Sequence, residues 1–210
     1  ALKVAKFGGT SLADAGQIRK VCRIVKADPA RRIIVVSAPG KRHPGDVKVT
    51  DLLIALAESL LAGRSGEPER AAVSERYAAI ATSLNLPRSV IRAIEADLRL
   101  RMAADRSHPD RFRDLLKAAG EDNSARLVAA ALTQQGMPAR YLNPGKAGLL
   151  LTDTPGNAMV LPESYPRLKK ALASTARVRI VFPGFFGVTR NGDVVTFPRG
   201  GSDITGAIVA

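Results

Sequence analysis

Near the amino terminus, the stretch from Lys6 to Ser11 (KFGGTS) combines a basic side chain, two glycines and two hydroxyls. It lies between an apolar segment expected to be a strand and a predicted helix. Glycines let backbone N–H groups face a bound anion without obstruction by a Cβ atom. The helix amino terminus also favours negative charge, and Lys6 adds a full positive charge. The stretch predicts a phosphate-binding loop, although a Gly-Gly pair alone is more often a turn and no Walker A pattern occurs.

A second stretch near the carboxyl terminus, Arg199 to Asp203 (RGGSD), has a similar design. It places two glycines, a hydroxyl and an acidic residue at the predicted start of a helix. Arg199 can bind a carboxylate or phosphate through its two-pronged guanidinium. The competing interpretation makes Ser202 or Asp203 a helix N-cap. Two such loops on one α/β sheet favour a ligand site, because both would lie at the carboxyl ends of its strands, where ligands of open sheets bind.

Two further segments carry polar side chains at predicted junctions between elements. Ser37 follows a buried apolar strand, and Thr50 is a good N-cap for the next helix. Glu121 lies in Gly120-Glu121-Asp122, which we expect to precede a helix. A lone glutamate at a helix start is more often a capping or dipole partner than a ligand-binding group.

The elements that must position these residues alternate between strands and helices. Apolar runs predict strands over 2–7, 32–38, 139–142, 149–151 and 179–182. Three- and four-residue spacing, N-caps and glycine stops predict helices over 14–27, 50–62, 122–135 and 162–174. Alternating residues around Asn191-Gly192 predict a hairpin over 188–196. The first strand–helix–strand unit requires parallel strands with a right-handed crossover.

Residues 68–118 interrupt this alternation, since they are rich in Ala, Arg and Leu and look helical throughout. We interpret the region from about 63 to 118 as a helical insertion. The fold class predicted from the elements is α/β, with helices layered on a mainly parallel open sheet.

The charge balance bears on the class of partner. The net charge is +13, and residues 1–50 hold 11 Lys and Arg against 3 Asp and Glu. A basic surface attracts nucleic acid, but aromatic residues make up only 4% and no nucleic-acid motif is recognisable. We therefore expect the charge to serve a nucleotide or solvation, with no nucleic-acid partner.

Other bulk features concern compartment and metal. No apolar run approaches the ~20 residues of a membrane span, so no membrane partner is expected. No signal peptide is recognisable, and the single cysteine, Cys22, fits a reducing compartment, so we expect the cytoplasm. His43 and His108 lack partners at metal-ligand spacing, and no side-chain metal site is predicted.

Four motifs, in the same order along the chain, resemble those of the aspartate kinases, which belong to the amino-acid kinase family. VAKFGGTS (4–11) resembles the family's amino-terminal signature. VVSAPG (35–40) with KVTDLL (48–53) resembles its second conserved region. GEDNSARL (120–127) resembles its substrate-side Gly-Glu motif, and the segment from 184 to 203 resembles its hairpin and RGGSD loop. Together these motifs span nearly the whole chain, but they leave out residues 41–47 and the helical insertion.

The resemblance implies transfer of the ATP γ-phosphoryl group to the β-carboxylate of L-aspartate. The product would be 4-phospho-L-aspartate, the first step toward lysine, threonine and methionine. The cofactors implied are ATP and Mg²⁺, because phosphoryl transfer depends on positioning and charge neutralisation.

Carried over residue by residue, the resemblance also assigns roles. Lys6 and Asp203 would be catalytic, with Asp203 organising Lys6 and the reacting groups. The residues implied to bind ATP are Lys6, Phe7, Gly8, Gly9, Thr10 and Ser11. Those implied to bind the amino acid, with Glu121 facing its α-ammonium group and Arg199 its carboxylate, are Ser37, Thr50, Glu121, Arg199 and Ser202.

For the fold, the resemblance implies an αβα sandwich of the amino-acid kinase type. Residues 1–210 would form the catalytic domain, incomplete at its carboxyl terminus, without the family's regulatory ACT domains. The full-length protein is expected to form a homodimer or higher homo-oligomer. Phe197-Pro198 departs from the family's usual Leu-Gly before the arginine. Two alternatives stay open: another amino-acid kinase such as glutamate 5-kinase, and a non-catalytic basic module that binds nucleotide or nucleic acid.

Overall fold

The computed structural model describes residues 2–173 and 178–210. Its main sheet has four parallel strands in the order β1-β2-β4-β3, and a separate antiparallel pair is formed by β5 and β6. The strands are β1 (Lys3–Phe7), β2 (Arg31–Val36), β3 (Ala139–Tyr141), β4 (Arg179–Pro183), β5 (Phe186–Val188) and β6 (Val194–Thr196). A 3-10 turn, η1 (Gly9–Leu12), follows β1.

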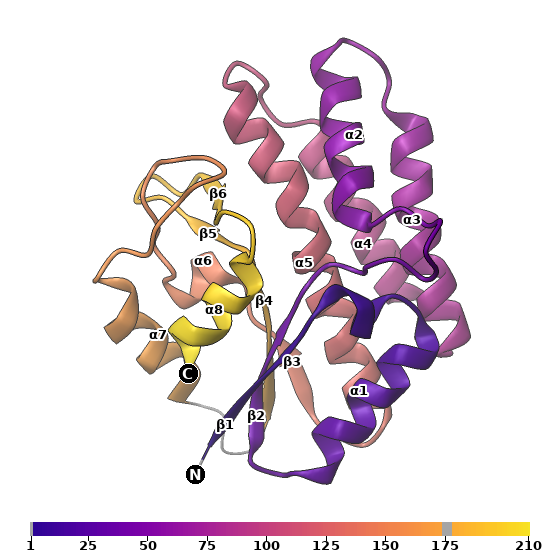
Figure 1. Cartoon of the computed structure of the whole chain (residues 1–210), viewed down its shortest axis with the longest axis vertical. Coiled ribbons are helices and arrows are strands. Elements are labelled where there is room, and N and C mark those ends of the chain that lie inside the picture. The colour runs from indigo at the N-terminus through magenta and orange to yellow at the C-terminus, as the bar shows by residue number, and fades with distance from the viewer. Residues whose placement is uncertain (1, 174–177) are drawn as a thin grey trace.

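Helices cover both faces of the main sheet, with α1 and α5 on one side and α7 and α8 on the other (Figure 1). They are α1 (Ala15–Ala27), α2 (Val49–Leu61), α3 (Glu67–Ser83), α4 (Arg88–Met102), α5 (Pro109–Gln134), α6 (Pro144–Ala147), α7 (Ser164–Leu172) and α8 (Gly201–Val209). This arrangement confirms the predicted αβα sandwich with a mainly parallel sheet. Among the described residues, no helix is both long and apolar enough to cross a bilayer.

Strand β2 shows why both faces need a helical layer. Ile34 and Val36 point into the core shared with α1, α2 and α5, whereas Ile33 and Val35 point into the core shared with α7 and α8. All four side chains are buried. Successive side chains of a strand face opposite sides, so a continuous apolar run suits a strand that is covered on both.

The region predicted as an insertion holds α3, α4 and the first part of α5, with no strand between them. Turns at 84–87 and 103–108 interrupt the helices that we expected to run throughout. The first turn contains Asn85, whose φ is 53°, and it is followed by the proline-capped start of α4. In Figure 1, α2, α3, α4 and the first part of α5 extend beyond the sheet as a group.

The predicted helix start at Asp122 is wrong, because α5 runs unbroken from Pro109 to Gln134. We interpreted Gly120 and the polar residues after it as a loop and N-cap. Gly120 instead allows close packing, since a Cβ atom there would lie 2.7 Å from the Cβ atom of Ala38. Polar side chains after it are buried, and two of them pair with distant residues: Asp122 accepts from Arg101 at 2.6 Å, and Asn123 donates to Asp97 at 2.9 Å.

The predicted strand over 149–151 is also wrong, since only isolated bridges form there. Leu150 pairs with Val188, and Leu151 pairs with Val160. Elsewhere the boundaries shift: β2 ends at Val36 rather than at residue 38, and α7 begins at Ser164 rather than at residue 162. The prediction that Thr50 caps α2 is wrong, because this helix begins at Val49 and its N-cap is Lys48. The predicted end of that helix, residue 174, lies outside the described residues. The hairpin around Asn191-Gly192 is confirmed by β5 and β6.

Candidate functional site

The candidate site lies at the edge of the sheet where the parallel strands end. The loops after β1, β2 and β4 are joined there by backbone hydrogen bonds. The amide of Ser37 donates to Phe7 (3.1 Å), that of Gly40 to Gly9 (2.8 Å), and that of Gly184 to Val36 (2.9 Å). Ligands of open parallel sheets bind at this edge, so the predicted loops converge on a suitable place.

Two neighbouring cavities open at this edge, with volumes of about 210 and 320 Å³, and they share Ser37, Thr50 and Glu121. We call them the first and the second cavity. The first is otherwise lined by Lys6, Phe185, Gly200, Gly201, Ser202 and Asp203. The second is otherwise lined by Gly9, Thr10, Ala38, Pro39, Gly40, Lys41 and Lys48. The shared residues make the two cavities one continuous site.

Lys6 and Asp203 meet in the first cavity, although they come from opposite ends of the chain. The Nζ atom of Lys6, which is near the end of β1, lies 2.8 Å from Oδ1 of Asp203 in the first turn of α8. The Lys6 side chain is 29% exposed and that of Asp203 is 75% exposed. An ammonium group has three donors, so Lys6 can keep this contact and still bind an anion in the cavity.

The loop before α8 owes its shape to glycine. Gly200 has a φ of 84°, in the left-handed region that glycine adopts readily, and it precedes the first residue of α8. Gly184 is equally constrained, because a Cβ atom there would lie 2.6 Å from Oγ of Ser202. The strand before this loop, β6, belongs to the two-stranded sheet. The expectation that the loop follows a strand of the parallel sheet is therefore wrong.

Phe185 is a site residue that the sequence did not suggest. It lines the first cavity and has a φ of 79°, which is uncommon for a residue other than glycine. Its amide donates to the hydroxyl of Thr205 at 3.0 Å, and its carbonyl accepts from the amide of Phe197 at 2.9 Å. Strained backbone of this kind collects at ligand sites, where surrounding contacts hold it. No sequence pattern signals such a conformation.

Glu121 is the buried acid at the junction of the two cavities. Its side chain comes from the middle of α5, the residue is 5% exposed, and its Oε2 atom has no hydrogen-bond partner among the described residues. Burial raises the pKa of Glu121 to about 8, a backbone hydrogen bond from Ala38 acts in the opposite direction, and Asp122 adds a small further increase. A buried acceptor without a partner is costly, so this carboxyl group is suited to a ligand that donates hydrogen bonds.

Of the predicted site residues, the structure brings most but not all to the cavities. Lys6, Gly9, Thr10, Ser37, Thr50, Glu121, Ser202 and Asp203 line them. Phe7 instead packs in the core, and Gly8 and Ser11 line neither cavity. Arg199 is exposed and lines neither cavity, because the chain turns at Gly200 directly after it. Lys41 and Lys48 line the second cavity and were not predicted.

Within the described part of the chain, no three His, Cys, Asp or Glu residues are grouped so that they could hold a metal ion. The exposed carboxylate in the first cavity belongs to Asp203. Mg²⁺ is commonly held by one or two carboxylates together with substrate phosphates, and Asp203 fits the protein part of such a set.

The sequence profile of the amino acid kinase family matches residues 1–210. This chain belongs to the amino acid kinase family. Among curated proteins, this amino acid kinase is 52% identical over 209 residues to Aspartokinase 3 of Bacillus subtilis (strain 168), a match that covers 100% of the chain and 46% of the relative.

Solved structures of aspartate kinases resemble this chain in fold. The crystal structure of Clostridium acetobutylicum aspartate kinase matches with a TM-score of 0.80 and 31% identity, covering 98% of this chain and 44% of that one. The structure of E. coli aspartokinase III in complex with aspartate and ADP (R-state) matches with a TM-score of 0.82 and 28% identity, covering 100% of this chain and 46% of that one. The chain thus spans about half the length of the relatives that it matches.

Proposed function

We propose that this chain carries the phosphoryl-transfer site of an aspartate kinase, which uses ATP to convert L-aspartate to 4-phospho-L-aspartate. The observation that carries the proposal is the distribution of charge in the joined cavities. A basic group, Lys6, lines the first cavity, and the buried acid Glu121 lies at the junction with an acceptor oxygen that has no partner in the described part of the chain. An amino acid with an ammonium group and a phosphate-bearing nucleotide need opposite charges at neighbouring points.

In the proposed reaction, an oxygen of the β-carboxylate attacks the γ-phosphorus of ATP. The bond between this phosphorus and the β,γ-bridging oxygen breaks, so ADP leaves and an acyl phosphate forms. Lys6 offsets negative charge on the transferring group, and Asp203 fixes the position of Lys6 through their ion pair. Mg²⁺ bound to the nucleotide would supply further charge neutralisation, with Asp203 as the protein carboxylate close to it.

The remaining site residues are proposed to bind rather than react. Glu121 receives the α-ammonium group, and Ser37, Thr50 and Ser202 supply hydroxyls around the amino acid. Backbone amides near Gly9 and Thr10 face the phosphates. Arg199 is proposed to bind the substrate carboxylate, which requires its exposed side chain to turn toward the first cavity. Phe7, Gly8 and Ser11 would support the phosphate loop from behind.

The wider proposal concerns the whole protein. Residues 1–210 would be the kinase part of a longer polypeptide, which fits a match to only 46% of the Bacillus relative. We also propose that the full-length protein acts in the cytoplasm and forms a homo-oligomer.

The test measures aspartyl-hydroxamate formation by the full-length protein that carries this sequence, with ATP and Mg²⁺ present. We expect product with L-aspartate and little with L-glutamate. A pocket shaped for one side chain discriminates against an extra methylene by roughly 10- to 200-fold. If glutamate were the better acceptor, glutamate 5-kinase activity would replace this proposal. The absence of ADP formation with either acceptor would contradict the kinase assignment.

A further inference from the structure

The segment after Gly40, which the family motifs leave out, forms a closed loop over residues 40–47. Arg42 binds Asp46 through Nε at 2.7 Å and Nη2 at 2.9 Å, and the Arg42 amide donates to the same carboxylate. The Asp46 amide donates back to the carbonyl of His43 at 3.0 Å. These contacts hold the pKa of Asp46 well below its usual range, chiefly through the Arg42 side chain. The 40–47 loop therefore has a defined shape of its own.

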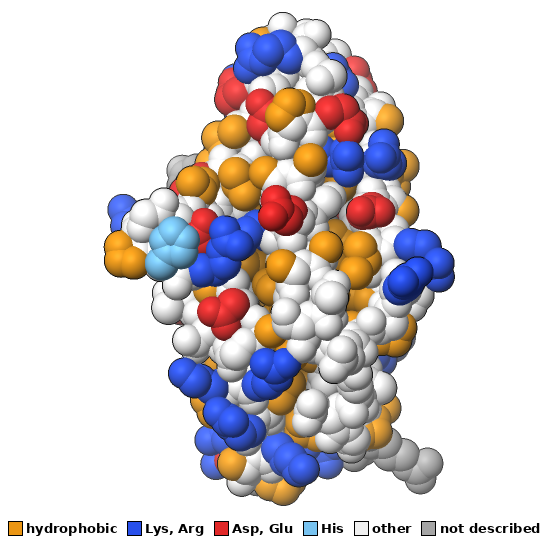
Figure 2. Space-filling model, turned by 90° about the vertical axis from the view of Figure 1, so that its right-hand side faces the viewer, with side chains coloured by type: hydrophobic (Ala, Val, Ile, Leu, Met, Phe, Trp, Pro, Cys, Tyr) orange, Lys and Arg blue, Asp and Glu red, His pale blue; other side chains and the backbone are white. Residues whose placement is uncertain are grey.

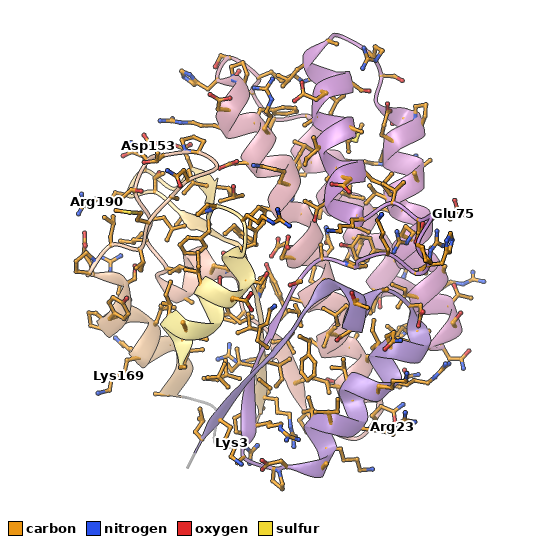
Figure 3. The ribbon with its side chains drawn as sticks, in the orientation of Figure 1. Lys3, Arg23, Glu75, Asp153, Lys169 and Arg190 are labelled. Carbon is orange, nitrogen blue, oxygen red and sulfur yellow. The ribbon has the colours of Figure 1, made fainter. Side chains whose placement is uncertain are left out.

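Arg76 in α3 anchors both ends of this loop. Its Nη1 atom donates to the carbonyl of Val47 and its Nη2 atom to the carbonyl of Gly40, each at 2.6 Å. Arg76 is 4% exposed and lies 3.5 Å from Asp46, whereas its neighbour Glu75 points outward into solvent (Figure 3). A planar guanidinium can bind two carbonyls at once in fixed geometry, which a lysine cannot.

The anchored ends of the loop are parts of the site. The Gly40 amide donates to the carbonyl of Gly9 at 2.8 Å, and a Cβ atom on Gly40 would lie 2.7 Å from the carbonyl carbon of Gly9. Gly40 and Lys41 at one end, and Lys48 directly after the other, line the second cavity beside Thr10. A shift of either end would change the width of this cavity.

Helix α3 also contacts the part of α5 that supplies the acid of the second cavity. The hydroxyl of Tyr77, the residue after Arg76, donates to the carbonyl of Gly120 at 2.6 Å. Gly120 precedes Glu121, the acid shared by both cavities. Adjacent residues of α3 thus fix the loop wall and the acid wall at the same time.

The cost of burying Arg76 indicates that its position matters. Burial lowers its pKa, although Asp46 partly offsets this effect, and its Nε atom has no partner among the described residues. Burying an arginine that is incompletely paired opposes folding. A solvent-exposed loop closed by Arg42 and Asp46 does not need such an anchor to keep its own shape.

We propose that Arg76 is a positioning residue of the candidate site, which holds the 40–47 loop against Gly9 so that this loop forms one wall of the second cavity. The part of this inference that concerns substrate rests on the proposed function. The part that concerns the loop does not, because it depends only on the contacts of Arg76.

The first test follows amide hydrogen exchange in the full-length protein. Arg76→Met removes both hydrogen bonds, whereas Arg76→Lys keeps the charge and can reach one carbonyl. Arg106→Met is the matched control, since Arg106 also donates to two carbonyls, those of Leu60 and Met102, but lines neither cavity. The probes are the amide of Gly40 and that of Val49, which donates to the carbonyl of Pro39 at 3.1 Å. We expect both to exchange at least tenfold faster in Arg76→Met, less so in Arg76→Lys, and at the parental rate in Arg106→Met.

The second test separates positioning from general stability by steady-state kinetics with aspartate and ATP. We expect Arg76→Lys to raise the KM for ATP about five- to tenfold with kcat within about twofold of the parent, because the loop forms the wall of the second cavity beside Gly9 and Thr10, where the phosphates are proposed to bind in the ground state. Asp46→Asn loosens the same loop without opening the core, so it should shift KM in the same direction if Arg76→Met fails to fold.

Two results would overturn the inference. One is unchanged exchange at Gly40 and Val49 in a folded Arg76→Met or Asp46→Asn protein. The other is a fall in kcat that follows the folded fraction with an unaltered KM. If the parent protein lacks aspartate kinase activity, the proposed function fails, but the exchange measurement still decides whether Arg76 holds the loop.

Discussion

Glu121 carries the most unusual protonation equilibrium among the site residues. Burial raises its pKa from the ordinary 4.5 to about 8, so the folded protein holds a proton there at neutral pH. A ligand ammonium group beside it would favour the charged form and lower this pKa. The same carboxyl group can therefore be neutral in the free protein and charged in the complex.

This pKa predicts how the stability of the unliganded protein depends on pH. Because the folded-state pKa lies above the unfolded value, the contribution of Glu121 to stability is fully present below about pH 4.5. It is then lost progressively as the pH rises through about 8. Urea unfolding of Glu121→Gln, compared with the parent between pH 5 and 9, should show a flatter profile. Parallel profiles for the two proteins would mean that Glu121 titrates normally.

Lys6 and Asp203 allow a direct test of the proposed chemistry. Lys6→Ala should lower kcat by about two orders of magnitude, which is typical when one preorganised electrostatic group is removed. Lys3→Ala is the control on the same strand, since Lys3 also forms a 2.8 Å ion pair, with Asp28, but lines neither cavity. Thermal unfolding should change little for either variant, because exposed ion pairs contribute only about 0–1 kcal/mol. Parental kcat in Lys6→Ala would remove Lys6 from the mechanism.

Arg199 should behave differently from Lys6. Because it is proposed to bind a carboxylate of the ground-state substrate, Arg199→Ala should raise the KM for aspartate while kcat changes little. The structure places its side chain in solvent, so no loss of stability is expected. Initial rates over a range of aspartate concentrations distinguish an effect on KM from an effect on kcat. An unchanged KM would mean that Arg199 does not bind the substrate.

At the scale of elements, helix α5 depends on a glycine in an unusual place. Gly→Ala in a helix interior normally stabilises by up to ~1 kcal/mol. At Gly120, however, the new Cβ atom would lie 2.7 Å from Ala38, which belongs to the loop after β2. Overpacking of this kind costs about 1–3 kcal/mol. We therefore expect Gly120→Ala to destabilise the protein and to lower the urea midpoint.

The matched control for this prediction is Gly206, which lies inside α8. A Cβ atom there would lie 3.6 Å from Lys6 Cβ, an ordinary contact. Gly206→Ala should therefore keep or raise the urea midpoint. If both variants shifted the midpoint in the same direction, the contact between Gly120 and Ala38 would not be the cause.

The elements differ in how well sequence predicts them. The buried run of β2, the amphipathic helix α1 and the Asn-Gly hairpin each follow from a local rule, and these elements formed close to their predicted bounds. The predicted start of α5 was wrong because a glycine followed by polar residues is typical of a helix end at the surface. In the structure, Arg101 and Tyr141 donate hydrogen bonds to Asp122 inside the fold. Hydrogen-bond partners that come from distant elements cannot be recognised from the local sequence.

The same distinction applies to the site. Glycine pairs and the flanking charged residues indicated the loops that converge, because their chemistry is local. The left-handed Phe185 and the anchoring role of Arg76 depend on packing against elements far away in the chain. Arg199 is exposed although its motif resembles a ligand-binding loop, and the local sequence does not specify where its side chain lies.

At the scale of the whole molecule, the arrangement of the positive charge bears on whether nucleic acid could bind. On the face shown in Figure 2, the basic side chains form separate groups with acidic and hydrophobic side chains between them. Figure 3 shows Arg23 and Lys169 pointing away from the protein on different sides. Several arginines are already paired with carboxylates, among them Arg42, Arg101, Arg111, Arg113 and Arg190.

This distribution predicts weak, non-specific attraction to nucleic acid. Binding to duplex DNA at low salt should disappear near 150 mM salt, and the slope of log K against log salt should be shallow, because few phosphates are contacted at once. A fluorescent duplex titrated at several salt concentrations measures this slope. A steep slope with binding that persists at 150 mM would favour the nucleic-acid-binding alternative.

The strand order β1-β2-β4-β3 also determines when the sheet can be completed during synthesis of the chain. Ile33 of β2 pairs with Ile180 of β4, so one edge of β2 stays unpaired until residues near 180 have been translated. At roughly 5–20 residues per second, that interval is on the order of ten seconds. An apolar strand edge left open this long invites pairing with other nascent chains. The rate of translation and the supply of chaperones should therefore limit the yield of native protein.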